Sequence, residues 1–163
     1  MKIVNAYLSW AKNSTRPKAV VIYESMWGAT EKMARKIVEG ITDAGLEVKL
    51  FDVTVSDRTE IVKEMLEAKG FVFGSSTHDN DMLPTMGGFL EFIKGLKPKN
   101  RLGCVFGSFG WAGGANKEME AVLKEAGIEL ASPGLSVKYA PDASDLKRCY
   151  EYGRELASRV KGD

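Results

Sequence analysis

Residues 18–37 read KAVVIYESMWGATEKMARKI, and the periodicity of apolar residues changes within this stretch. The run over 18–23 is apolar and rich in β-branched residues, which predicts a buried strand. Met33 and Ile37 then lie at helical spacing, which predicts a helix directly after the turn at 24–30. The stretch therefore predicts a strand, a turn and a helix in that order.

The same order of strand and helix repeats along the rest of the chain. The further predicted pairs are strand 46–53 with a helix capped by Ser56 or Asp57, strand 70–75 with helix 84–95, strand 102–108 with helix 115–126, and strand 135–139 with helix 144–160. Parallel strands are joined by right-handed helical crossovers, so this alternation predicts an α/β fold, a three-layer α/β/α sandwich. We expect a five-stranded parallel sheet in the order 2-1-3-4-5. The second strand alternates polar and apolar residues, as an edge strand should.

Residues 1–17 precede this repeating pattern. Apolar residues of the segment Ile3 to Lys12 fall on one helical face, which predicts a short helix docked on the domain. The segment Asn13–Pro17 is typical of a linker, so the helix is equally well explained as the tail of something upstream. We therefore divide the chain into an N-terminal helix and linker, 1–17, and one α/β domain, 18–163.

Composition indicates an ordinary globular protein and excludes several classes of partner. The 163 residues are 44% hydrophobic, and 23 basic side chains nearly balance 22 acidic ones, which argues against nucleic acid or an anionic membrane as principal partner. The sequence has no long apolar run and no secretory signal pattern, so we expect a cytoplasmic protein. Cys104 and Cys149 lack metal-type spacing and His78 is the single histidine, so we expect packed thiols and no metal site.

Loops at the carboxyl ends of the strands are expected to form one ligand site, because ligands of such sheets bind where the winding reverses. Loop 24–30 opens a helix, whose bare N–H groups favour an anion, and it contains no lysine or arginine. It lacks both the nucleotide-binding G-x-x-x-x-G-K-[ST] pattern and the dinucleotide G-x-G-x-x-G pattern. Loop 108–114 combines glycines with Phe and Trp, which suits a flat apolar ligand. Loop 75–83, between these two loops in the sequence, is the third loop expected at the site.

Three stretches resemble a known family. Residues 21–37, VIYESMWGATEKMARKI, resemble the flavodoxin signature, and SSTHDNDMLPTMGGFLEFIKGLKPKN and GSFGWAGGA resemble the flavodoxin-like domain of flavodiiron proteins (A-type flavoproteins). The resemblance runs from about residue 3 to the end. It implies a flavodoxin-like sandwich that binds FMN and transfers electrons. In that family a metallo-β-lactamase-like di-iron domain precedes this one, and a single histidine cannot supply its ligands, so the reduction of oxygen or nitric oxide is not implied for this chain.

The resemblance also implies which residues hold the cofactor. Ser25, Met26, Gly28, Ala29 and Thr30 match the phosphate loop, with Trp27 beside them either covering the flavin or docking a partner. Thr77, His78, Asp79 and Asn80 match the loop beside the isoalloxazine ring, and Ser108, Phe109, Gly110, Trp111, Gly113 and Gly114 match the loop at its pyrimidine edge. No catalytic side chain is expected, because the flavin carries the redox chemistry. Redox partners such as rubredoxin, a reductase or a di-iron protein are implied by the resemblance alone.

Two other functions are compatible with the same architecture. An NAD(P)H-dependent quinone or flavin reductase would need an extra pocket over the ring, and no insertion is long enough to build one, although a homodimer interface would supply it. A phosphoacceptor receiver domain would need clustered acids after the first strand and an aspartate at the end of the third. The chain has Glu24 and Ser25 at the first place and Gly74 and Ser75 at the second, which disfavours a receiver domain.

Overall fold

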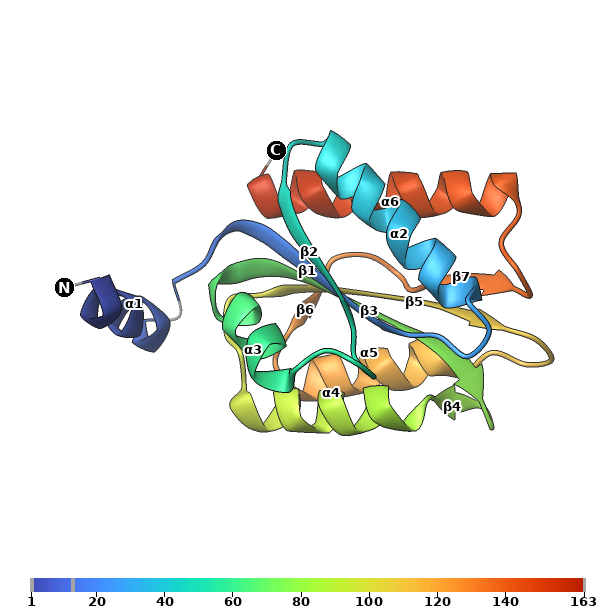
Figure 1. Ribbon diagram of the computed structural model, residues 1–163, viewed down its shortest axis with the longest axis horizontal. Helices are drawn as coiled ribbons and strands as arrows, with labels where there is room; N and C mark the ends of the chain where they lie inside the picture. The colour runs from blue at the N-terminus through green and yellow to red at the C-terminus, as the bar shows by residue number, and fades with distance from the viewer. Residues whose placement is uncertain (1, 13, 163) are drawn as a thin grey trace.

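The computed structural model describes residues 2–12 and 14–162. Its elements alternate along the chain much as the sequence predicts (Figure 1). In chain order they are α1 (Lys2–Ala11), β1 (Arg16–Glu24), α2 (Ala29–Asp43), β2 (Glu47–Asp52), α3 (Arg58–Glu67), β3 (Ala68–His78), β4 (Asp81–Met82), α4 (Pro84–Leu96), β5 (Leu102–Phe109), α5 (Ala115–Glu125), β6 (Glu129–Leu130), β7 (Leu135–Lys138) and α6 (Ala143–Lys161).

The sheet confirms the predicted parallel order. Its path runs β2-β1-β3-β5-β6, and β7 also pairs in parallel with β5. The predicted fifth strand is β7, which occupies the same edge of the sheet as β6. The sequence analysis missed β6 and β4, because two residues are too short to show a strand periodicity.

Two layers of helices cover the sheet, with α2 and α6 on one face and α3, α4 and α5 on the other (Figure 1). Successive residues of β1 alternate between the layers: Val21 packs toward α2 and α6, and Ile22 toward the opposite face. This is why the strand is apolar throughout. Within the described residues no helix has the length and apolarity that a membrane crossing requires.

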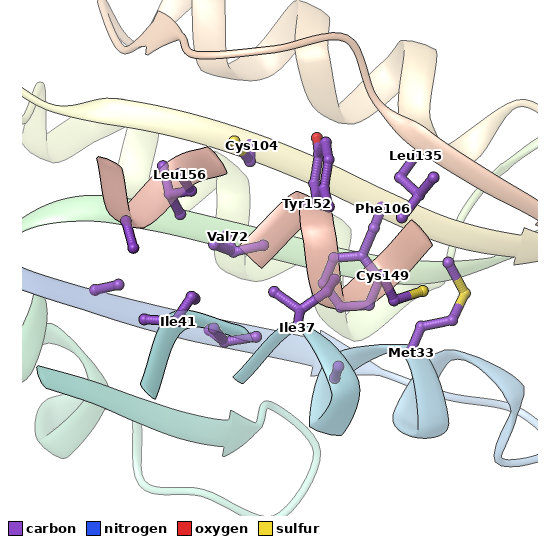
Figure 2. Packing of buried hydrophobic residues seen from close by; sticks show 14 of the residues in the cluster. Met33, Ile37, Ile41, Val72, Cys104, Phe106, Leu135, Cys149, Tyr152 and Leu156 are labelled. Atoms are coloured by element: carbon purple, nitrogen blue, oxygen red, sulfur yellow. The ribbon is translucent and has the colours of Figure 1, made fainter. Parts of the chain in front are cut away.

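The α2–α6 side of the core is shown in Figure 2, where Ile37 of α2 and Cys149 and Tyr152 of α6 belong to one buried cluster. The Tyr152 hydroxyl lies within hydrogen-bond distance of two backbone carbonyls, Val105 O at 2.9 Å and Pro133 O at 3.0 Å. A buried hydroxyl needs a partner, and here it links α6 to β5 and to the segment before β7. The expected burial of both cysteines as free thiols is confirmed.

Both thiols are expected to be unreactive in the folded protein. Burial raises the pKa of Cys149 to about 11 and also raises the pKa of Cys104, so neither forms appreciable thiolate near pH 8. Ellman's reagent at pH 8 should modify both thiols in urea but neither in buffer alone. Because the folded pKa of Cys149 is raised, its contribution to stability is present below pH 9 and is lost as pH rises toward 11. Rapid modification of the native protein would contradict this.

The N-terminal segment differs from the prediction in two ways. Helix α1 lies to one side of the sandwich, and its side chains Ile3, Val4 and Leu8 are exposed, so of the two explanations left open by the sequence, docking of this face on the domain is not observed (Figure 1). Strand β1 begins at Arg16 rather than at residue 18. Arg16 pairs with Glu47 at the start of β2 and with Glu67 at the end of α3, contacts that local sequence does not encode.

Candidate functional site

A hollow of about 420 Å³ lies at the carboxyl ends of the strands, at the end of the sheet remote from α1 (Figure 1). All three loops predicted to form the site contribute to it, together with the segment after β7. The residues that line it are Met26, Trp27, Ala29, Ser76, Thr77, Ser108, Phe109, Gly110, Trp111, Tyr139 and Ala140. The expected meeting of the loops is therefore observed in the fold.

The first loop turns into α2 without a side-chain cap. Gly28 is the N-cap residue and has φ 83°, a left-handed conformation that glycine adopts without strain. Its N–H donates to Ser25 Oγ at 3.0 Å, and the Met26 N–H donates to Ser76 Oγ at 3.2 Å, so hydroxyl oxygens hold the turn in shape. No side chain caps the N–H groups of the first turn of α2, so these groups can donate to an anion. Residues 24–30 include no basic side chain that would assist.

Beneath this loop lies a cluster of three buried hydroxyls. Thr30 Oγ1 is 3.0 Å from Ser76 Oγ and 2.9 Å from Ser108 Oγ, and the two serine oxygens are 3.5 Å apart. The cluster connects the start of α2 to the carboxyl ends of β3 and β5. Sequence reasoning placed Thr30 and Ser108 in the site but missed Ser76, although it directly follows the predicted strand 70–75 and so carried the same signal.

The second loop is a tight hairpin between β3 and β4. Thr77 pairs with Met82 and His78 with Asp81, and the two turn residues Asp79 and Asn80 have φ of 50° and 62°. Left-handed conformations at both central residues belong to the turn type that matches strand twist, in which Asp and Asn are favoured. The segment that the sequence predicted only as a loop therefore contains a regular hairpin.

Two contacts connect the second loop to its surroundings. Its base is held where Leu83 N–H donates to Ser75 Oγ at 2.9 Å. The buried Glu24 carboxylate accepts from Met86 N–H at 2.6 Å, close to the start of α4. A carboxylate at a helix N-terminus is favourable, so Glu24 also links the end of β1 to α4.

Exposed aromatic rings surround the hollow. The side chains of Trp27 and Trp111 are 89% and 97% exposed, and Tyr139 is also exposed. Large rings left in water beside a hollow indicate a surface for a flat ligand or a partner. The sequence analysis missed Tyr139, which lies at the carboxyl end of the predicted strand 135–139. Its N–H donates to Phe109 O at 2.7 Å, so it sits beside the third loop.

The other predicted site residues belong to the second and third loops. A second, smaller hollow is lined by Thr77, Asp79, Asn80, Gly110, Trp111 and Ala112, so the second and third loops face one another. His78 is exposed, with Nδ1 3.4 Å from the Asp79 carboxylate. A Cβ on Gly113 would lie 3.7 Å from the Phe109 ring, whereas one on Gly114 would overlap the carbonyl oxygen of Asn80.

Comparison with known proteins gives the family. The family model described as Flavodoxin matches residues 21–153, which is most of the chain. The chain belongs to the flavodoxin family. Structural similarity agrees: a flavodoxin from the domain Archaea superposes with a TM-score of 0.82 at 31% identity, over 88% of this chain and 99% of that one.

Flavodiiron proteins match over a still larger part of this flavodoxin-family chain. It is 47% identical to a nitric oxide reductase of Moorella thermoacetica over 98% of its length, and 39% identical to the anaerobic nitric oxide reductase flavorubredoxin of Escherichia coli K12 over 96%. Rubredoxin oxygen:oxidoreductase from Desulfovibrio gigas superposes with a TM-score of 0.93 at 35% identity and 98% coverage. The chain spans only 40%, 33% and 40% of these three proteins, respectively. The resemblance to the flavodoxin-like domain of flavodiiron proteins is thus confirmed.

FMN is the cofactor of this family, and the residues present fit it. Its phosphate needs several donors, which the uncapped start of α2 offers without a cation. Its flat ring needs an accessible, mostly apolar hollow with aromatic neighbours, which Trp27, Trp111 and Tyr139 provide. The flavodoxin-like fold and the chemistry of the hollow therefore agree on a redox role.

Proposed function

We propose that this chain carries electrons on one FMN, with the phosphate at the first loop and the ring in the hollow between the second and third loops. The single observation that carries the proposal is the juxtaposition of an uncapped helix N-terminus, free of basic side chains, with a hollow rimmed by exposed aromatic rings. Bound FMN supplies the redox chemistry, and the protein supplies binding, orientation and electrostatics.

The chain's own residues divide these tasks. The uncapped backbone N–H groups at the start of α2 bind the phosphate, and the hydroxyl cluster beneath them keeps the loop in the binding conformation. Trp27 and Trp111 offer ring faces for stacking and restrict water at the site. Asp79 and Asp81 bring negative charge to the second loop, which opposes a gain of negative charge at this site and so lowers the reduction potential.

We further infer that the electrons pass within a system of the flavodiiron type. The support is the identity with nitric oxide reductases, whose names describe whole proteins of which this chain matches a part. The partners we propose are a rubredoxin or a reductase as electron donor and a di-iron protein as acceptor. The exposed rings of Trp27 and Trp111 beside the hollow suit transient docking of such proteins.

Titration of the cofactor-free protein with FMN and with riboflavin tests the proposal. We expect one equivalent of FMN to bind with quenched flavin fluorescence, to give a yellow protein that dithionite bleaches, and to bind far more tightly than riboflavin, which lacks the phosphate. Folded protein that fails to bind FMN would refute the proposal. Rapid steady-state oxidation of NAD(P)H with a quinone would instead favour the reductase alternative.

Ser76→Ala is expected to weaken FMN binding about tenfold. The change removes the acceptor for Met26 N–H and one partner of Thr30 in the hydroxyl cluster, at a cost of about 1.4 kcal/mol in hydrogen bonding. Fluorescence titration of wild type and variant gives the two dissociation constants. Ser56→Ala, in the loop between β2 and α3, serves as the matched control and should leave the constant unchanged. Equal affinities of S76A and wild type would show that the cluster does not shape the loop.

A further inference from the structure

A buried arginine lies at the end of the sheet remote from the flavin hollow. Arg101 precedes β5 and is only 5% exposed. Its Nη1 donates to Lys99 O at 2.6 Å and Nη2 to Leu66 O at 2.9 Å, while the buried Nε has no hydrogen-bond partner. The guanidinium also lies over the Phe71 ring, 5.9 Å from its centroid. The position of Arg101 is therefore well defined, but its donors are not all used.

The positive charge of Arg101 has no carboxylate partner among the described residues. Among the described residues its polar partners are backbone carbonyls, and it forms no ion pair with a carboxylate. Burial alone lowers the pKa of this guanidinium, with no acidic neighbour raising it. The contrast with Lys18 is informative, because that equally buried cation pairs with Glu47 and Glu64. An unpaired buried charge is costly, so a bound anion would relieve an existing penalty.

Arg101 lines a hollow of about 250 Å³ between α3 and α4. Its other walls are apolar, with Val62 and Leu66 from α3, Ile93 and Leu96 from α4, and Phe71 from β3. On its other side Arg101 lines a polar hollow together with Lys69 and Arg159, where Glu129 is the single acid among the lining residues. Arg101 is thus the charged residue in the lining of an otherwise apolar hollow, and it also lines the polar hollow next to it.

We propose that this second pocket binds a small carboxylate with an apolar tail. The carboxylate accepts from the guanidinium N–H groups of Arg101 that the backbone carbonyls leave unused, and the tail packs among Val62, Ile93 and Leu96. A neutral apolar molecule would leave the charge uncompensated, and a cation would meet like charge. The volume is below the range of about 300–1,000 Å³ typical of pockets for drug-sized ligands, so the tail is short. The pocket is independent of the proposed FMN site.

Hexanoate is the probe that tests the pocket. The controls are 1-hexanol and hexylammonium, which have the same chain length but a neutral and a positively charged head group. Titrating each into the full chain loaded with FMN, followed by amide chemical shifts, should give saturable shifts at Val62, Phe71 and Leu96 with hexanoate. We expect 1-hexanol to bind at least tenfold more weakly and hexylammonium not to bind. Equal affinity for hexanoate and 1-hexanol, shifts confined to other regions, or no saturable shift would each overturn the proposal.

Two variants assign the effect to the pocket. Arg101→Met keeps an apolar stem and removes the charge, so the preference for hexanoate over 1-hexanol should disappear. Leu96→Glu places a carboxylate on the half-exposed rim, where it should compete with hexanoate and abolish its binding even if R101M fails to fold. Both are expected to bind FMN as wild type does. Unchanged hexanoate binding in L96E would contradict the proposed site.

Discussion

Replacing Gly114 by valine is expected to weaken FMN binding about 100-fold. A Cβ at this position would overlap the carbonyl oxygen of Asn80, so the second loop must move away from the third. Overpacking against backbone costs about 3 kcal/mol, which corresponds to that loss of affinity if the loops must regain their spacing to bind FMN. Fluorescence titration measures it.

Gly95→Val is the control for this effect. A Cβ on Gly95, near the end of α4, meets no atom within 4 Å, so the same substitution should leave FMN affinity unchanged. Far-UV circular dichroism of G114V should match wild type, because the change moves loops rather than the core. Wild-type affinity in G114V would mean that the spacing of the second and third loops does not matter for the cofactor.

Gly153→Val is expected to cost at least about 3 kcal/mol of the free energy of unfolding. Gly153 of α6 lies against the carbonyl oxygen of Ile37 in α2, and Gly40 of α2 lies against that of Tyr150 in α6, so the two helices touch through backbone. A valine side chain must push α2 and α6 apart and open the core between them. Urea unfolding of the cofactor-free protein should show the loss, with a melting temperature about 6–12 °C lower.

The same substitution at Gly88 separates close packing from helix propensity. Gly88 lies in α4 and a Cβ there meets no atom within 4 Å, so G88V changes propensity without overpacking. We expect G88V to unfold within about 0.5 kcal/mol of wild type. Similar losses in G153V and G88V would show that the α2–α6 contact is not tight.

Much of the fold was predictable because its signals are local. The long strands and helices appear in the periodicity of apolar residues, and the parallel order follows from their alternation. The strands β4 and β6 were missed because two residues are too short to show a strand periodicity, and β6 and the early start of β1 also depend on pairing partners distant in sequence. The sequence also left open whether the apolar face of α1 docks on the domain, because amphipathicity predicts a buried face without identifying its partner.

For the candidate site, too, features that depend on local sequence were predictable, and features that depend on tertiary contacts were not. The three loops predicted to form the site do line one hollow, because the carboxyl ends of parallel strands meet at one edge. Ser76 and Tyr139 were missed although both follow predicted strands, since only the tertiary structure shows which residues of a loop face the hollow.

By itself, then, the sequence determined the α/β alternation, the absence of basic side chains from loop 24–30 and the flavodoxin resemblance, all of which reside in neighbouring residues. The tertiary structure alone decided the hydroxyl cluster of Thr30, Ser76 and Ser108, the contact of Gly114 with Asn80 and the unpaired charge of Arg101. The physical reason is that hydrogen bonding, steric exclusion and desolvation depend on distances between atoms. Only the packed chain sets those distances for residues far apart in sequence.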